Sequence, residues 1–586
     1  MIQPVTISLD NSDIDAFVSV DALDEQANRA ANLPANADVT LESKVSCPAI
    51  PAVRRIPGDF ETPLGLAQNA AFLHDKLDSS AHPPVSIGNW IPAPHSEGRD
   101  GSVPPFHVPD PAGDAYLAGL NVAALDNEEE ALSPRLMPGW VDHLKEIGVV
   151  PCDAVVHEVD FKVVEMLAIE DGRAVRKLAG FPHTDILSQA AAQGVQLKPG
   201  QLVSATFPTP FVREQVAKLG GVLVQDSDTS RTNNKHEFRQ AAERYGFSVF
   251  PGVSVSSEAE LIQHTQELRR VCDRARSHGA NPKYVARLKD PCSSGGDGVR
   301  GIEAPISEDS MRSALNGILG GIERSYQLAE YGDRSMGLRW RDARRNSFPH
   351  PLVLEHDAAM VGEVLFNGSF MVEIHDDGRY AVPRYFGQKT DREGSFRGGY
   401  TINKTSSQWS SVFTEKADKL LAASIDGVVR YWHGELGVRG MAGVDFMLVR
   451  RYEDGAIVPY LFDPNVRPTI NSISNAIAGK VERATGFTAW ENINGWAPTE
   501  LTSMSDFESL LNLGDGLDFY RGCEYGIVVP IAHRSMYSKN DDGSISCVRP
   551  TCAAKFLIAA KNEADVENIS KLLAKRRGLR YSSDEQ

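Results

Sequence analysis

The chain has 586 residues, which is too many for one hydrophobic core and predicts three or four domains. Its formal net charge of -18 argues against a general nucleic-acid or anionic-membrane binder, because such proteins display an excess of Lys and Arg. The composition therefore favours a protein that acts on small molecules.

The cysteines and the apolar runs indicate a cytoplasmic protein. The seven cysteines are scattered with no C-x-x-C pair, which predicts reduced thiols rather than a disulfide framework or a zinc site. No run of 18 apolar residues occurs, and the N-terminus shows no basic segment followed by an apolar core. Neither secretion nor membrane spanning is expected.

The first 228 residues divide into two parts. Residues 1–110 are polar and rich in proline, so we expect a partly disordered N-terminal extension without chemistry. Residues 111–228 alternate short apolar runs with helical segments, for example Leu202–Ala205 before Pro210–Leu219, which predicts a small α/β domain. This part lacks a G-x-G-x-x-G sequence, so a supporting or substrate-facing role is favoured over dinucleotide binding.

Residues 229–475 hold most of the candidate chemistry, beginning with two lysines. Lys235 opens an amphipathic helix, and Lys289 ends the strand-like run Tyr284–Lys289. The loop that follows is rich in glycine, which lets backbone N–H groups approach phosphates closely, while a lysine at the strand end adds a positive charge. Taken singly, a solvated lysine and an ordinary surface turn are the simpler alternatives. The loop glycines of interest are Gly295, Gly296 and Gly298.

The middle of this region supplies acidic and basic residues. Glu355 ends the apolar run Pro351–Glu355, and such a strand can offer backbone groups to adenine while Glu363 accepts hydrogen bonds from ribose; the alternative is two surface glutamates. The arginine-rich stretch 321–350 is either a solvated helical face or a clamp for carboxylate or phosphate. The polar loop Asp391–Tyr400, which contains Arg397, would close over an anionic substrate or serve as a mobile linker.

Two apolar runs, Gly443–Arg451 and Ile457–Asn465, predict a β-hairpin around a short turn. If Tyr452 pairs with Ala456, Asp445 lies directly opposite Asp463, and Asn465 shares their face. Two carboxylates about 5 Å apart repel by roughly 3 kcal/mol at an effective dielectric of about 20, and a cation removes that cost. Oxygen ligands of this kind suit Mg²⁺. The apolar positions expected to cover the other face are Val444, Phe446, Leu448, Tyr460 and Phe462.

The hairpin also has a simpler interpretation. The Asp463–Asn465 segment can be a strand-ending turn and Asp445 a hydrogen-bonded polar group of the core.

Beyond the hairpin, residues 484–586 contain strand-like runs at Gly526–Ala532 and Ala553–Ala560 and a charged helix at Glu563–Arg577. These predict a small C-terminal α+β module without a catalytic set of its own.

As an ordered series, these features resemble the ATP-grasp superfamily of carboxylate-amine ligases across residues 229–475. The resemblance implies an α+β ATP-grasp fold preceded by a small α/β pre-ATP-grasp domain. Two departures stand out: Asp463 occupies a position where the family more often has Glu, and the arginine-rich insertion has no general counterpart. The series consists of Lys235, Lys289, the loop glycines, Glu355 with Glu363, Asp445, and Asp463-Pro464-Asn465-Val466-Arg467.

The resemblance also implies roles for these residues. Lys235, Lys289 and the loop glycines 295, 296 and 298 would bind the ATP phosphates, with Glu355 at the adenine hinge and Glu363 on the ribose. The Mg²⁺ ligands would be Asp445, Asp463 and Asn465. Arg467 would stabilise charge on the transferring phosphoryl group or the tetrahedral intermediate, and we place Lys289 and Arg397 with it as catalytic residues.

The wider layout resembles the pheganomycin-type peptide ligases. This implies formation of an amide bond through an acyl phosphate, with amino acids or small peptides as substrates, in small-peptide or natural-product biosynthesis. The alternatives are a non-catalytic ATP-binding regulatory protein and a carboxylase-type ATP-grasp enzyme, the latter disfavoured because no biotin-attachment Met-Lys-Met occurs. The sequence leaves open the donor acid, the acceptor amine and the oligomeric state, for which a homodimer is one arrangement.

Overall fold

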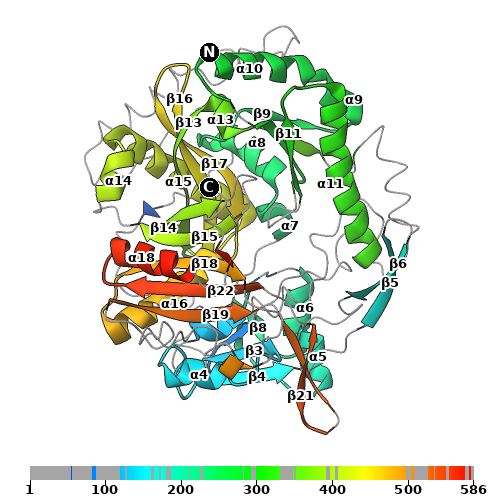
Figure 1. The fold of residues 1–586 in the computed structure, drawn as a ribbon, viewed down its shortest axis with the longest axis vertical. Coiled ribbons are helices and arrows are strands. Elements are labelled where there is room, and N and C mark those ends of the chain that lie inside the picture. Colours follow the sequence, from blue (N-terminus) through cyan, green and yellow to red (C-terminus); the bar gives the residue numbers. More distant parts are fainter. Residues whose placement is uncertain are drawn as a thin grey trace.

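The computed structural model describes residues 54–55, 82–87, 119–125, 129–159, 164–170, 173–179, 186–206, 208, 210–224, 229–281, 283–291, 298–329, 348, 351–390, 396–402, 407–496, 503–506, 525–533, 535–540, 542–549, 553–574 and 580–581. Three sheets organise this part of the chain. Figure 1 shows a parallel sheet at the lower end, a large central sheet in the middle and a small antiparallel sheet at the upper end.

The lower sheet has five strands in the order β4-β3-β2-β7-β8, and every neighbouring pair is parallel. The α/β alternation read from residues 111–228 agrees with this arrangement. Its central strand, however, comes from residues that were expected to belong to the extension, so that expectation needs correcting at residues 82–87. The elements are β2 (Val85–Ile87), β3 (Glu130–Pro134), α4 (Trp140–Glu146), β4 (Val155–Val159), α5 (Ile186–Ala192), β7 (Leu202–Ala205), α6 (Pro210–Lys218) and β8 (Val222–Leu223).

The upper sheet has four antiparallel strands in the order β11-β10-β12-β9. Helices α9, α10 and α11 share one hydrophobic core with it. Strand β10 has the bounds that the sequence predicts. The elements are β9 (Gly252–Val255), α9 (Glu258–Gln263), α10 (Thr265–Ser277), β10 (Tyr284–Lys289), β11 (Val299–Glu303), α11 (Glu308–Ala329) and β12 (Leu352–His356).

The central sheet runs in the order β17-β16-β13-β14-β15-β18-β22-β19, with β1 (Arg54–Arg55) and β23 (Arg580–Tyr581) attached beside β14 and β18. The C-terminal strands extend this sheet because β18 pairs with β15, so they do not form a separate module. The main strands are β13 (Gly362–Ile374), β14 (Arg379–Thr390), β15 (Phe396–Ile402), β16 (Gly440–Arg451), β17 (Ile457–Asn465), β18 (Ala489–Trp496), β19 (Gly526–His533) and β22 (Ala553–Ala560).

Alternation of side chains along the strands gives the central sheet two buried faces. On one face, α8 (Lys235–Tyr245) and α15 (Glu415–Leu436) pack against Phe370 and Phe446. On the other, α16 (Ile470–Thr485) and α18 (Glu563–Ala574) share a core with β18, β19 and β22. Strand β17 lies at the end of the strand order, beside α8.

The smaller elements lie around these sheets: β5 (Val164–Glu170), β6 (Arg173–Ala179), α7 (Thr229–Thr232), α13 (Ala358–Val361), α14 (Ser407–Val412), β20 (Met536–Lys539) and β21 (Ile545–Arg549). Among the helices that the structure describes, none has the length and apolar character needed to cross a membrane.

Candidate active site

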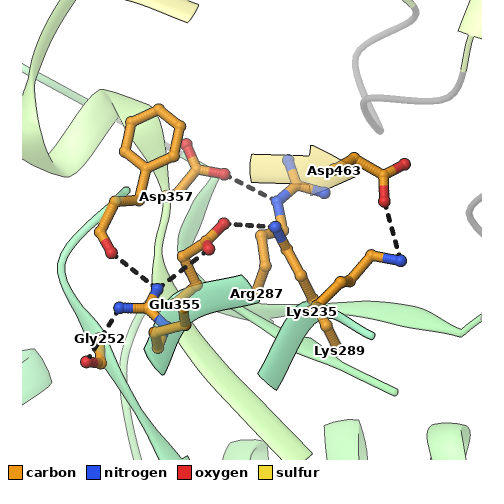
Figure 2. Close-up of polar contacts among 9 residues, drawn as sticks. Lys235, Gly252, Arg287, Lys289, Glu355, Asp357 and Asp463 are labelled. Atoms are coloured by element: carbon orange, nitrogen blue, oxygen red, sulfur yellow. Dashed lines mark hydrogen bonds and ion pairs between the residues drawn. The ribbon is translucent and has the colours of Figure 1, made fainter. Parts of the chain in front are cut away.

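Helix α8 places Lys235 at its first residue. Asn234 is the N-cap, and its side-chain oxygen accepts hydrogen bonds from the backbone N–H groups of His236 (3.0 Å) and Glu237 (3.2 Å). The backbone N–H of Lys235 donates to the carbonyl of Pro291 at 3.0 Å, which ties the start of the helix to the segment after β10. The Lys235 side chain is only 8% exposed, and its Nζ lies 2.8 Å from Oδ1 of Asp463 (Figure 2).

Strands β16 and β17 place Asp445 directly opposite Asp463, which confirms the predicted pairing. The route to it differs from the prediction. Arg451, not Tyr452, pairs with Ala456 through a 2.9 Å backbone hydrogen bond, so the register near the turn is offset by one residue. A β-bulge between Phe446 and Asp445 leaves Phe462 as the extra residue and restores the expected pairing at the aspartates.

The bulge also changes which apolar side chains lie beside the aspartates. Val444, Phe446 and Leu448 are fully buried in the core under α8 and α15, as expected for the opposite face. Tyr460 and Phe462 instead cluster with Phe250, whose ring centroid lies 4.8 Å from that of Tyr460 and 6.1 Å from that of Phe462. Their expected placement on the opposite face is therefore wrong, because the pairing in this part of the hairpin is shifted by one residue.

Asp445 is partly buried and lies next to charged side chains. Burial raises the pKa of Asp445, and repulsion from the Asp463 carboxylate raises it further. Gln388 on β14 donates a hydrogen bond from Nε2 to Oδ1 of Asp445 at 2.8 Å, which favours the charged form. Two carboxylates facing each other with Asn465 nearby form an oxygen donor set that suits Mg²⁺. No group of three or more His, Cys, Asp or Glu side chains offers a competing metal site within the described part of the chain.

The end of β17 fixes Asn465 and Arg467 against each other. Arg467 donates from Nη2 to Oδ1 of Asn465 at 2.8 Å, and Asn465 donates from Nδ2 to the carbonyl of Asp463 at 3.1 Å. The backbone N–H of Val466 donates to Oδ1 of Asn233 at 2.9 Å, which joins this segment to the turn before α8. Burial lowers the pKa of the Arg467 guanidinium, and the Asp463 and Asp445 carboxylates oppose that shift.

On the upper sheet, Glu355 lies between two cations. Its carboxylate accepts a hydrogen bond from Nζ of Lys289 (Figure 2). It also pairs with Nη2 of Arg239 at 3.1 Å. The side chains of Lys289 and Glu355 are 8% and 7% exposed. Nζ of Lys289 also lies 5.3 Å from the ring centroid of Phe462. Lys289 thus reaches from the upper sheet to the hairpin of the central sheet.

The structure brings together Lys235, Lys289, Glu355, Asp445, Asp463, Asn465 and Arg467. Glu363 lies apart from them. Its side chain is 57% exposed and pairs with Arg450, which lies five residues from Asp445 along β16. Five residues of strand at roughly 3.3 Å each place the Glu363–Arg450 pair about 16 Å from Asp445.

The expected loops lie largely outside the described residues. These include Gly295 and Gly296, whereas Gly298 is described and its carbonyl accepts a 2.8 Å hydrogen bond from the N–H of Asp290. Most of the arginine-rich stretch is likewise outside, apart from the end of α11. The segment Phe396–Tyr400 belongs to strand β15 and not to a loop. Arg397 therefore sits on a strand, two residues before Gly399, which lies opposite Gln388.

Three residues of the site were not identified from the sequence. Arg239 follows Lys235 by four residues, so both lie on one side of α8, and this spacing was the available signal. Gln388 and Asn233 carried no such signal. Gln388 reaches Asp445 because β14 and β16 both flank β13, and this strand order is a tertiary property.

Comparison with known proteins adds distant structural likenesses. No protein-family model matches the chain, and no curated protein matches it. Biotin carboxylase from Campylobacter jejuni, solved with β,γ-ATP, is 12% identical with a TM-score of 0.39 over 68% of this chain and 79% of that chain. Carboxyaminoimidazole ribonucleotide synthase from Aspergillus clavatus, solved with ATP, is 12% identical with a TM-score of 0.40 over 83% and 96%.

D-alanyl-alanine synthetase A from Vibrio cholerae is 10% identical with a TM-score of 0.33 over 69% of this chain and 95% of that chain. Likenesses at this level do not assign a family, so the chemistry of this chain is inferred from its own residues.

Proposed function

We propose that this protein is an ATP-dependent carboxylate-amine ligase that activates a carboxylate as an acyl phosphate and transfers the acyl group to an amine. The observation that carries the proposal is the convergence of Lys235 and Lys289 on the face where Asp445 opposes Asp463. Two buried lysines beside two carboxylates form the setting that a metal-bound polyphosphate requires, because the cations neutralise phosphate oxygens and the carboxylates hold the metal.

The ion pairs also suggest how ATP would enter. Lys235 pairs with Asp463, and Lys289 pairs with Glu355. In the proposal, phosphates take over both lysines, which frees Asp463 for Mg²⁺ and Glu355 for the nucleoside end. The partly buried ring of Phe462, which packs against the buried rings of Phe250 and Tyr460 and lies beside Lys289, would offer an apolar contact to a purine base.

The candidate metal ligands are Asp445, Asp463 and the side-chain oxygen of Asn465. Mg²⁺ held there would neutralise charge on the phosphate oxygens. Arg467, already hydrogen-bonded to Asn465, would stabilise the negative charge that develops on the transferred phosphoryl group and then on the tetrahedral intermediate. Arg397 would meet the carboxylate substrate from β15.

In the first step a carboxylate oxygen attacks the γ-phosphorus, an O–P bond forms, and the bond to the β-bridging oxygen breaks to release ADP. In the second step a neutral amine attacks the acyl carbon, an amide bond forms, and phosphate leaves with the proton balance completed by solvent. No side-chain nucleophile is required. The finer proposal, from the resemblance to pheganomycin-type ligases, is that amino acids or small peptides supply both groups.

A phosphate-release screen over amino acids, singly and in pairs, tests the proposal. With ATP and Mg²⁺, we expect release of ADP and phosphate that depends on a carboxylate, and hydroxylamine should trap the acyl phosphate as a hydroxamate. Asp463→Asn should lose this activity, whereas Asp454→Asn, in the turn of the same hairpin, should keep it. Tight ATP binding without ADP formation across the panel would support a non-catalytic nucleotide-binding protein, and turnover with bicarbonate alone would support a carboxylase-type enzyme.

A further inference from the structure

A line of buried polar side chains runs across the central sheet from the reacting end of the site. Ser369 on β13 lies directly opposite Asp445 and is 2% exposed. Asn471, in the first turn of α16, donates from Nδ2 to Oγ of Ser369 at 3.4 Å. Its Oδ1 accepts a 3.1 Å hydrogen bond from Nδ2 of Asn492 on β18.

The line ends at a lysine on β22. Oδ1 of Asn492 accepts two hydrogen bonds, one from the backbone N–H of Gly399 and one from Nζ of Lys555, each at 3.1 Å. Asn492 and Lys555 are fully buried. We call Ser369, Asn471, Asn492 and Lys555 the polar relay; it joins β13, α16, β18 and β22.

Burying a lysine side chain in a protein core costs free energy, because its amine loses contact with water. Burial lowers the pKa of Lys555 to about 7, so at neutral pH the site carries a large desolvation cost. An apolar side chain of the same length would pack there without that cost, and buried polar groups of this kind fix one specific arrangement of their neighbours. One such neighbour is the start of α16, which follows Arg467 in the chain.

The start of α16 determines where Arg467 lies. Thr469 caps the helix in a capping box with Ser472, in which each side-chain oxygen accepts a hydrogen bond from the other residue's N–H, at 3.2 and 2.8 Å. Arg467 lies two residues before this cap. The segment is held at its first end by Asn233 through Val466, and at its far end by the polar relay through Asn471.

We propose that Lys555, acting through Asn492 and Asn471, is a positioning residue that sets the location of Arg467, so that the C-terminal strands of the sheet are needed for turnover and not for nucleotide binding. The inference rests on the proposed ligase function. Displacement of a charge-stabilising group by about 1 Å can reduce turnover on the order of a hundredfold, even when the displaced contact lies far from the chemistry.

Two variants interrupt the polar relay in different ways. Lys555→Met replaces the amine with an apolar chain of similar length. Gly399→Ala leaves Lys555 intact and displaces Asn471, because a Cβ at residue 399 would lie 2.0 Å from Oδ1 of Asn471 and its nearest contacts are all with that flexible side chain. Lys571→Met, which removes the same charge from the exposed surface of α18, is the matched control.

Amide hydrogen exchange of residues 466–473 and steady-state kinetics are the measurements. In both relay variants we expect at least tenfold faster exchange in this segment, a fall in kcat of tenfold or more, and KM for ATP within about twofold of the parent protein. Lys571→Met should change none of these. Unaltered exchange in Lys555→Met would overturn the inference, and if that variant does not fold, unaltered exchange in Gly399→Ala would overturn it.

The exchange measurement separates this inference from the proposed function, since it needs no substrate. A parent protein without carboxylate-dependent turnover would remove the ligase proposal. The positioning role alone would be removed if the parent protein turns over normally and, in the relay variants, KM for ATP rises by as much as kcat falls. Loss of ATP binding in the relay variants would have the same consequence.

Discussion

Asp445 lies opposite Asp463 because the hairpin that carries them contains a β-bulge at Phe462. Without that extra residue the pairing set at the turn would continue, and Asp445 would lie opposite Phe462. The bulge therefore creates the acidic pair on which the proposed metal site depends, and it turns the ring of Phe462 towards Lys289. Bulges near a site commonly redirect a side chain in this way.

Asp463→Asn should abolish turnover while leaving the fold intact. The amide keeps an acceptor for Lys235 but removes one of the two carboxylates that would hold Mg²⁺. We expect a loss of at least about a hundredfold in Mg²⁺-dependent phosphate release, comparable to removing one charge-stabilising group. Thermal melting measures the fold. Unchanged turnover at saturating Mg²⁺ would remove the metal assignment.

Lys289→Met should chiefly weaken ATP binding. Loss of one charge-assisted hydrogen bond costs about 1.5 to 3 kcal/mol, which corresponds to roughly ten- to a hundredfold in Kd. Calorimetric titration with ATP and Mg²⁺ measures the effect. Lys283→Met, at an exposed lysine six residues earlier, is the control and should bind ATP normally. An ATP affinity equal to that of the control would discard the phosphate-binding role.

Glu373 should make the protein less stable as the pH rises from about 4.5 to about 7. Burial raises the pKa of Glu373 to about 7 from an ordinary value of 4.5, so in this window the folded state keeps a proton that the unfolded state has released. Glu373→Gln should remove this decline and stabilise the protein above pH 7 by at most about 3 kcal/mol. Urea unfolding at pH 5 and pH 8 measures it, with Glu453→Gln in the exposed hairpin turn as control. Equal pH dependence in both variants would contradict the prediction.

Lys555 should make the protein more stable as the pH rises above neutral. Burial lowers the pKa of Lys555 to about 7 from 10.5, so between these values the unfolded state holds a proton that the folded state has lost. The free energy of unfolding should therefore gain, as the pH rises from 7 to 9, a contribution of up to about 3 kcal/mol that is missing in Lys555→Met. Because tyrosines and cysteines also titrate in this range, the quantity to compare is the difference between Lys555→Met and Lys571→Met. No difference between them would show that Lys555 does not titrate as its burial implies.

Local pattern in the sequence was enough to predict several elements and residues. The helix that begins at Lys235, the strand that ends at Lys289, and the pairing of Asp445 with Asp463 are all read from the chain and are all present. The helix and the strand depend on interactions between neighbours in the sequence, such as an N-cap or a short apolar run, whereas the aspartate pair reaches its predicted register only through the bulge at Phe462. The proposed roles of these residues remain predictions.

Other features were decided by the tertiary structure, because they depend on which strands become neighbours. Nothing local to Val85–Ile87 marks it as the centre of a parallel sheet, and nothing near Ala489–Trp496 shows that this strand continues the sheet of the site. The hydrogen bonds from Gln388 to Asp445 and from Lys555 to Asn492 also depend on which strands become neighbours. The hairpin illustrates both cases. Its two aspartates were evident from the sequence. The bulge that aligns them and the cations that face them depend on long-range packing, which a periodic pattern in the sequence does not show.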